Sequence, residues 1–215
     1  MKALVTGFEP FGADAINPSG EAVLRLPSRL DDLTIDTRIV PTVFGRAIAA
    51  LEDAVAATRP DIVLCVGLAG GRAELSLERV AINVDDARIP DNDGQQPIDR
   101  PIVATGPAAY FTGLPVKAAV AALREAGLPA IVSNTAGTFV CNHIFYGLMH
   151  LVASRRLPVR GGFLHVPYLP EQAAGPGGNQ VPSMALDDIV RGIEIILRVA
   201  AARTEDIATA EGAIA

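Results

Sequence analysis

The sequence predicts an α/β fold built around a twisted, mostly parallel sheet. Apolar runs of strand length alternate along the chain with Ala- and Leu-rich segments of helical periodicity. Half of the 215 residues are hydrophobic and 20% are charged, so one sizeable core can form. We therefore expect a single domain over residues 1–203, with a frayed tail over 204–215 because this stretch is small and polar.

In the first third of the chain, strands and helices alternate. After the first strand, Asn17 caps a helix whose first position is Pro18, where the missing N–H costs no hydrogen bond. The next helix carries apolar residues on one face, and a continuous apolar run, typical of a buried parallel strand, follows it. The expected elements are Lys2–Thr6 (strand), a helix from Pro18, Leu33–Val43 (extended), Arg46–Thr58 (helix) and Asp61–Val66 (strand).

The same alternation continues to the end of the domain. Gly127 ends one helix, and the closing helix turns Ile189 and Ile193 inward, with Asp187 and Asp188 near its positive end. Two irregular, Pro- and Gly-rich stretches are candidate lids. The expected elements are Leu77–Val84 (strand), Val116–Ala126 (helix), Ala130–Ser133 (strand), a helix beginning near Cys141, Phe163–Val166 (strand) and Ser183–Ala202 (helix), with lids at Asp85–Gly106 and Pro167–Pro182.

Composition excludes several classes of partner. A formal charge of -6, a pI near 5.0 and the lack of a basic run argue against nucleic acid. No apolar run reaches membrane-spanning length, and the Met-Lys start leads directly into a strand, so we expect a cytoplasmic protein without membrane contact. The two cysteines form no Cys-x-x-Cys pair, so we expect no disulfide, no metal and no cofactor.

Cys141 is the candidate nucleophile, because it lies where an apolar strand ends and a helix begins. The free N–H groups and the dipole of a helix's first turn favour the thiolate, which is the attacking species. Cys65 lies inside the apolar strand DIVLCVG, and we interpret it as a packing residue.

Helical geometry separates the three histidines. His143 lies about 200° around the helix from Cys141 and faces away from it, and His150 lies about 13 Å further along the axis. His165 ends another apolar strand, and neighbouring parallel strands place their carboxyl ends together, so His165 is the candidate base. Spacing does not choose the group that orients it, and the candidates are Glu78, Asn83, Asp85, Asp86, Asp91, Asn92 and Glu171.

Five motifs, in the same order over nearly the whole chain, resemble the pyroglutamyl-peptidase I family of cysteine peptidases. They are VTGFEPFG with NPS (up to Ser19), GLAGGR with LERVAIN (67–83), DDARIPDNDGQQP (85–97), SNTAGTFVCNHIFYGLMH (133–150) and HVPYLPEQ (165–172). The resemblance implies a three-layer α/β/α sandwich around a mixed sheet. It also implies Cys141 as nucleophile, His165 as base and Glu78 as the third member, in an enzyme that removes an N-terminal pyroglutamyl residue through a thioester. The family forms dimers and tetramers. The resemblance therefore implies a homo-oligomer, either a dimer or a homotetramer.

The flat, neutral pyroglutamyl lactam favours an apolar pocket with a few backbone hydrogen bonds. Phe8 and Phe11, in GFEPFG, fit this description, and the family uses phenylalanines at the matched positions. Amides at the start of the Cys141 helix, with Arg88 as a weaker candidate, would hold the oxyanion. The matched motifs add Asn17, Leu68, Ile89, Phe139 and Val140 as pocket candidates, Leu68 standing where some members have Gln.

Two other functions remain as alternatives. The glycine-rich turn GLAGGR follows a strand and could cradle a phosphate, as in a nucleoside phosphorylase, although it lacks the lysine and spacing of a P-loop. A binding module that keeps the pocket without turnover is the second, and the presence of Cys141, His165 and Glu78 argues against it.

Overall fold

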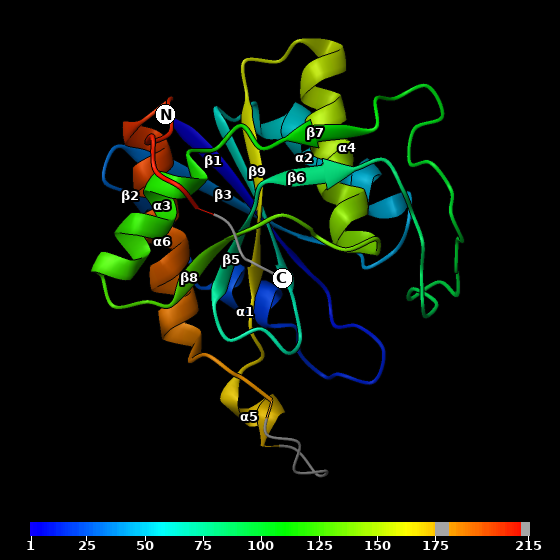
Figure 1. Cartoon of the computed structure of the whole chain (residues 1–215), viewed down its shortest axis with the longest axis horizontal. Helices are drawn as coiled ribbons and strands as arrows, with labels where there is room; N and C mark the ends of the chain where they lie inside the picture. The colour runs from blue at the N-terminus through cyan, green and yellow to red at the C-terminus, as the bar shows by residue number, and fades with distance from the viewer. Residues whose placement is uncertain (175–180, 212–215) are drawn as a thin grey trace.

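The computed structural model of the chain describes residues 1–174 and 181–211, and these form three layers (Figure 1). The middle layer is a seven-stranded sheet in the order β2-β3-β1-β4-β9-β5-β8. Its strands are β1 (Lys2–Phe8), β2 (Arg29–Leu30), β3 (Leu33–Val40), β4 (Ile62–Leu68), β5 (Leu75–Glu78), β8 (Ala130–Ser133) and β9 (Arg160–Val166). The expected α/β/α sandwich is confirmed.

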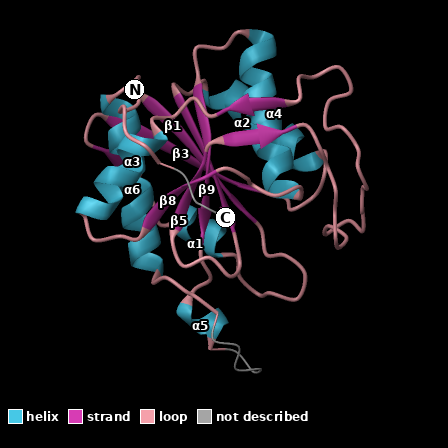
Figure 2. Cartoon of the chain, in the orientation of Figure 1, coloured by secondary structure: helices cyan, strands magenta, loops and turns pink. Residues whose placement is uncertain are grey.

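Helices cover both faces of the sheet (Figure 2). The helices α1 (Pro18–Leu24), α3 (Val116–Glu125) and α6 (Leu186–Ala202) pack on one face, and α2 (Arg46–Thr58) and α4 (Val140–Arg155) on the other. The short helix α5 (Pro170–Ala173) follows β9. No helix among the described residues is both long enough and apolar enough to cross a membrane.

The sheet is mixed, and this corrects one premise about the site. Strands β1, β3, β4 and β9 are parallel, β2 is antiparallel to β3, and β5 is antiparallel to β9 while β8 is parallel to β5. The strand before Cys141 therefore runs opposite to the strand that carries His165, with β5 between them. The two carboxyl ends do not meet as neighbouring parallel strands, and the loop 134–139 brings the chain back toward β4 and β9.

Strand alternation decides which layer the polar side chains face. Leu75 and Leu77 of β5 belong to the core under α3 and α6, so Glu78 points to the opposite layer. On β9, Leu164 belongs to the same core, so His165 also points away from it. Both polar side chains thus face the layer of α2 and α4, where Cys141 begins its helix.

The predicted elements Leu77–Val84 and Ser183–Ala202 differ from the structure, and one strand of the main sheet is absent from the prediction. The expected strand Leu77–Val84 is divided at Arg79, whose N–H donates to Ser133 O, and the chain then leaves the main sheet. It continues as β6 (Val80–Ile82), which pairs with β7 (Ala109–Phe111) in a separate two-stranded sheet. Strand β2 was not predicted. Helix α6 begins at Leu186 rather than at Ser183, because Ser183 forms a bridge with Tyr168.

The two candidate lids differ in what the structure describes. The stretch Asp85–Gly106 is tied down by buried Asp91, whose carboxylate accepts hydrogen bonds from Phe44 N (2.9 Å), Asp93 N (2.9 Å) and Gln95 N (2.8 Å). Of Pro167–Pro182, residues 175–180 lie outside the described residues.

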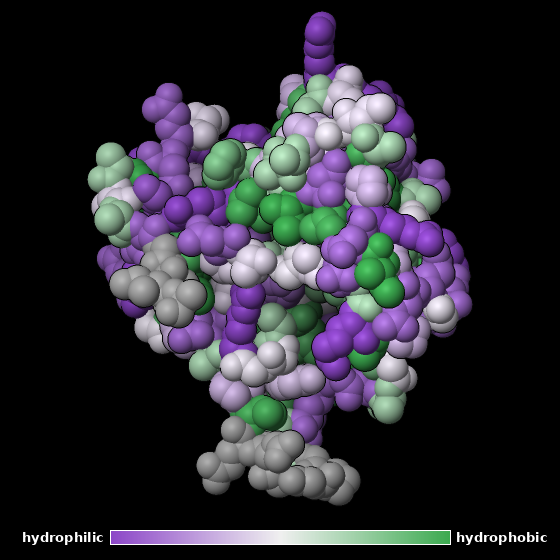
Figure 3. Space-filling view, turned by 45° about the vertical axis from the view of Figure 1, so that its right-hand side comes forward, coloured by the Kyte–Doolittle hydropathy of each residue, from purple (hydrophilic) through white to green (hydrophobic). Residues whose placement is uncertain are grey.

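Most of the surface in view is polar, with an apolar patch in the upper middle of the face shown in Figure 3. Large apolar side chains with high exposure include Phe111, at 71%, and Ile98, at 68%.

The tail contacts α3 as far as it is described, through Asp206 and Glu211. Helix α3 lacks a side-chain cap of its own, and Asp206 supplies one by accepting from Lys117 N and Ala118 N, both at 2.9 Å. Glu211 forms a two-pronged ion pair with Arg124 (2.7 and 3.2 Å). Residues 212–215 lie outside the described residues.

Replacing Asp206 with Ala should lower the free energy of unfolding by about 1 kcal/mol, the usual effect of losing a helix cap. Thermal unfolding followed by circular dichroism measures this change. Glu205→Ala is the matched control, because Glu205 is an exposed neighbouring carboxylate. Equal melting temperatures for the two variants would show that Asp206 does not stabilise the helix.

Candidate active site

Cys141 is the second residue of α4, in a turn with free amides. Phe139 is the N-cap residue, and the first helical hydrogen bond runs from His143 N to Phe139 O (3.0 Å). The amides of Val140, Cys141 and Asn142 therefore have no carbonyl of the helix to bind. A developing negative charge beside the thiol would find donors there.

The thiol lies against the β4–β9 strand pair. A Cβ atom added to Gly67 would lie 2.9 Å from Cys141 Sγ and 2.8 Å from Phe163 Cζ, both too close for a real side chain. Gly67 is paired in register with His165 on the adjacent strand. The absence of a side chain at Gly67 thus lets the thiol lie on the sheet at the level of His165.

His165 is paired with a buried carboxylate. Its Nδ1 lies 2.7 Å from Glu78 Oε1, and the two residues are 4% and 0% exposed. A carboxylate only accepts, so Nδ1 carries the hydrogen and Nε2 is left with a lone pair. The edge of Phe163 packs on the imidazole ring, with centroids 4.8 Å apart. The ring is thus fixed in the tautomer that a general base needs.

Burial keeps both reacting groups neutral. It raises the pKa of the Cys141 thiol to about 12, with Glu78 raising it further and Arg72 opposing. Burial also lowers the pKa of His165 below its ordinary value, against the effect of Glu78 and together with Arg72. Burial thus opposes the thiolate that the start of the helix was expected to favour.

Access, rather than acidity, separates the two cysteines. Burial raises the pKa of Cys65 to about 12 as well, with Thr6 opposing. Cys65 is 0% exposed in the core between the sheet and α4, whereas Cys141 is partly exposed and lines a cavity. The interpretation of Cys65 as a packing residue is confirmed.

The other histidines have structural partners. His143 Nδ1 binds Asp85 (2.8 and 3.0 Å), and its Nε2 accepts from Gly45 N at 2.8 Å. His150 Nδ1 lies 2.9 Å from Tyr110 OH. Neither ring is free to serve the thiol, as the helical geometry predicted.

The cavity beside the thiol holds about 350 Å³. Phe11 and Phe139 both line it and contact each other edge to face, with ring centroids 5.3 Å apart. Five of the predicted pocket residues line it, together with Arg88, and three further lining residues were missed. The predicted ones are Phe8, Phe11, Asn17, Leu68 and Phe139; the missed ones are Thr42, Gly70 and Tyr168. Gly70 and Tyr168 lie within two of the family motifs, GLAGGR and HVPYLPEQ, and these motifs could have indicated both as pocket residues.

Two of the predicted pocket residues, Val140 and Ile89, do not line this cavity. Val140 is fully buried in the core under α2 and α4, because it occupies the inward face of the first helical turn. Ile89 is partly buried and is not part of the cavity wall. Arg88 is exposed at the wall and makes no ion pair within the described ranges 1–174 and 181–211.

Asn142, also missed, fixes the first turn of α4. Its side-chain oxygen accepts from Ile82 N (3.0 Å), and its amide donates to Ile82 O (2.9 Å) and Val84 O (3.1 Å). The Asn142 side chain thus joins the start of α4 to β6. Because Asn142 directly follows Cys141 in the sequence, these hydrogen bonds also hold Cys141 in place.

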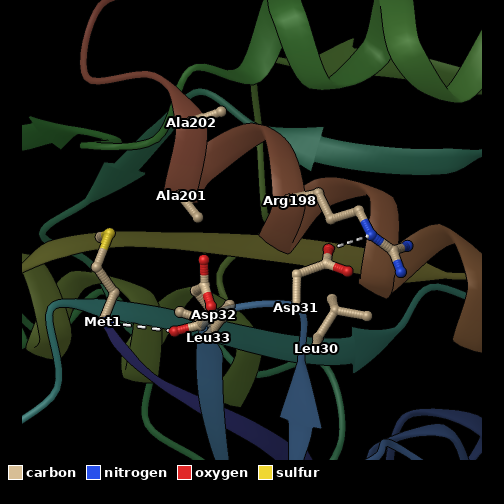
Figure 4. Close-up of a pocket in the computed structure, with 8 residues that line it drawn as sticks. All are labelled: Met1, Leu30, Asp31, Asp32, Leu33, Arg198, Ala201 and Ala202. Carbon is tan, nitrogen blue, oxygen red and sulfur yellow. Dashed lines mark hydrogen bonds and ion pairs between the residues drawn. The ribbon is translucent and has the colours of Figure 1, made fainter.

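A second cavity, of about 430 Å³, lies near the N-terminus and the end of α6 (Figure 4). Asp31 and Arg198 form an ion pair in it at 2.9 Å. Its eight labelled lining residues include no cysteine, serine or histidine. The cavity described before, by contrast, has the thiol of Cys141 in its wall.

A thiol at a helix start, a carboxylate-bound imidazole and an aromatic cavity identify the class as an α/β cysteine hydrolase. The sequence matches the Pyroglutamyl peptidase family over residues 1–203. It is 58% identical to pyrrolidone-carboxylate peptidase 1 of Ralstonia nicotianae, covering 97% of each chain. The crystal structure of pyroglutamyl peptidase I from Bacillus amyloliquefaciens is similar with a TM-score of 0.93 at 49% identity, covering 96% of this chain and 99% of that one. A variant pyrrolidone carboxyl peptidase from Pyrococcus furiosus gives a TM-score of 0.91 at 43% identity, covering 94% and 99%. The chain belongs to the pyroglutamyl peptidase family of cysteine peptidases.

Proposed function

We propose that this chain removes an N-terminal pyroglutamyl residue from peptides, with Cys141 as nucleophile, His165 as base and Glu78 as the group that orients the imidazole. The observation that carries the proposal is the 2.7 Å contact between His165 and Glu78 on the sheet surface against which the thiol lies. Family membership supports the same activity.

The reaction begins with proton transfer from Cys141 Sγ to His165 Nε2. The sulfur attacks the carbonyl that joins pyroglutamate to the next residue, and the carbonyl oxygen becomes an oxyanion. His165 then protonates the leaving amine as the C–N bond breaks, which leaves a thioester on Cys141. Water, activated by the same imidazole, hydrolyses the thioester and restores the thiol.

The walls of the cavity suit a neutral lactam. Phe8, Phe11 and Phe139 offer apolar and aromatic surface for a flat ring without charge. The amides of the first turn of α4 would hold the oxyanion. Exposed Arg88, at the wall, is a secondary contributor in this proposal.

The phosphorylase alternative is not favoured by the glycine-rich turn. A side chain at Gly67 would collide with Cys141 and Phe163, and one at Gly70 would collide with Tyr168, at 2.7 Å from Cε2. Close packing with side chains thus accounts for both glycines, and no phosphate is needed to explain them.

Pyroglutamyl arylamide should be hydrolysed about 10⁴-fold faster, in kcat/KM, than prolyl arylamide, because a site that binds the lactam carbonyl leaves polar groups unpaired when proline enters. Glutaminyl arylamide should be rejected as strongly, since its charged amine would be desolvated against apolar walls. The assay is run with a reducing agent, and a chelator should leave the rate unchanged.

Comparable rates on the prolyl substrate would contradict the lactam pocket. Binding of pyroglutamate without turnover of any substrate would indicate a binding module, and phosphate-dependent cleavage of nucleosides would indicate a phosphorylase.

Assembly and location are further parts of the proposal. The chain would act as a homo-oligomer, a dimer or tetramer, in the cytoplasm, without nucleic acid, metal or cofactor. Exposed Phe111 and the apolar patch in Figure 3 support burial of surface between copies.

A further inference from the structure

Arg72 contacts the carboxylate that orients the imidazole. It lies in the loop between β4 and β5, and its Nη1 donates to Glu78 Oε1 at 2.7 Å. The same oxygen accepts from His165 Nδ1, also at 2.7 Å. The Glu78 side chain is fully buried, whereas 27% of the Arg72 side chain is exposed. The guanidinium thus approaches the pair from the solvent side.

The guanidinium is held in position by a third segment, the end of β8. Nη2 of Arg72 donates to Thr135 O at 3.1 Å, and Nη1 lies 3.4 Å from Ser133 Oγ. Ser133 Oγ in turn accepts from Thr135 N at 3.3 Å. These contacts aim the charge of Arg72 at Glu78 rather than leaving it in solvent.

A buried carboxylate requires such a partner. The second oxygen of Glu78, Oε2, has no hydrogen-bond partner among the described residues. An uncompensated charge there would be costly, because burial penalises an unpaired ion heavily. Without Arg72, His165 would be the remaining hydrogen-bond partner of the Glu78 carboxylate that could carry a positive charge, so Glu78 would favour the protonated imidazole. A protonated His165 cannot accept the proton of the thiol.

We propose that Arg72 is a positioning residue for the reaction, which holds the Glu78 carboxylate against His165 Nδ1 and compensates its charge, so that His165 Nε2 is free to accept the proton of Cys141. This inference rests on the proposed function of the three residues. It extends that function from a triad to a charge-compensated group of four.

The groups that face one another here come from several elements: Glu78 on β5, His165 on β9, Cys141 on α4 and Cys65 on β4. Arg72 lowers the pKa of His165 and that of Cys141, and Glu78 raises both. Removing the positive charge therefore moves the pKa of His165 upward. Activity needs neutral His165, so the acid side of the pH profile should move to higher pH.

The experiment measures kcat/KM for pyroglutamyl arylamide against pH in Arg72→Met. We expect a loss of roughly 10- to 100-fold near pH 6 that becomes smaller above pH 8, with the acid limb displaced upward. Arg72→Lys keeps the positive charge but loses the two-donor geometry of the guanidinium. The acid limb of its pH profile should therefore lie between those of Arg72→Met and the parent chain. The Lys variant also supplies a folded protein if the Met variant does not fold.

Arg79→Met is the matched control. Arg79 is adjacent to Glu78 in sequence, but its guanidinium donates to the backbone oxygen of Glu211. The acid limb of the pH profile of Arg79→Met should coincide with that of the parent chain. The rate of Cys141 alkylation by iodoacetamide, measured against pH without substrate, should show the same order of variants.

A double-mutant comparison separates action through Glu78 from a merely structural role. In a Glu78→Gln background there is no charge to compensate, so adding Arg72→Met should displace the acid limb less than it does in the parent chain. An unmoved limb in Arg72→Met, with an equal loss of rate in both backgrounds, would overturn the proposal. Failure of the proposed function would be seen separately, as a parent chain that does not hydrolyse the arylamide or as a Cys141→Ala variant that still does.

Discussion

Cys141→Ala should lose turnover of pyroglutamyl arylamide by about 10⁵-fold or more, because a nucleophile that acts with its base accounts for most of the chemical step. The thiol lies at the helix start, against the sheet and beside the cavity, so little else can replace it. Steady-state kinetics at high enzyme concentration measures the residual rate. Melting temperature, measured in parallel, checks that the variant is folded.

Cys65→Ser is the matched control and should keep most of the activity. In the unmodified chain, one equivalent of iodoacetamide should label Cys141 and abolish turnover. Both thiols are kept protonated by burial, so access to the cavity decides which one reacts. Peptide mapping that finds the label mainly on Cys65, with activity lost, would contradict the assignment.

His165→Ala should lose several orders of magnitude in turnover. Loss of a general base alone costs about 10² to 10⁴, and here the thiol also depends on the base to lose its proton. Activity of the parent chain should fall as the pH drops through the pKa of His165, which burial lowers below its ordinary value. The pH profile of kcat/KM checks this. In His165→Ala, the residual rate should no longer fall at low pH in this way.

His143→Ala is the control from the same helix as Cys141. It breaks the contacts of a buried histidine with Asp85 and Gly45, so we expect a loss of stability of about 3 kcal/mol rather than of chemistry. A folded His143→Ala protein as inactive as His165→Ala would show that the helical geometry was misread.

The sequence could predict that Cys141 lies at the start of a helix and that His143 and His150 lie away from its thiol, because local geometry constrains all three. The choice of His165 rested on the ends of neighbouring parallel strands, which β8 and β9 are not. A helix start is visible from the end of the apolar strand before it, and helical spacing alone separates Cys141 from His143 and His150. The alternation of LSLE also shows that Glu78 faces away from Leu75 and Leu77. None of these patterns says that β5 lies beside β9.

Long-range pairing decides the remainder of the site. Glu78 meets His165 because β5 is antiparallel to β9, with Ser76 opposite His165 and Glu78 opposite Phe163. Glu78 and His165 are thus diagonal neighbours on one face of the sheet, although 87 positions separate them in the sequence. Arg72 and Asn142 act through partners from other elements, so spacing gave no reason to select them. The protonated state of Cys141 depends on burial, which no local pattern measures.

The place of β9 in the sheet has a consequence for how the chain is made. This strand is the last of the sheet to leave the ribosome, yet it lies between β4 and β5. Until it is inserted, β4 and β5 each present an unpaired edge, the kind of surface that pairs with other chains. The nascent protein therefore has two open half-sheets between the synthesis of β8 and that of β9, and the same late strand that joins them carries His165.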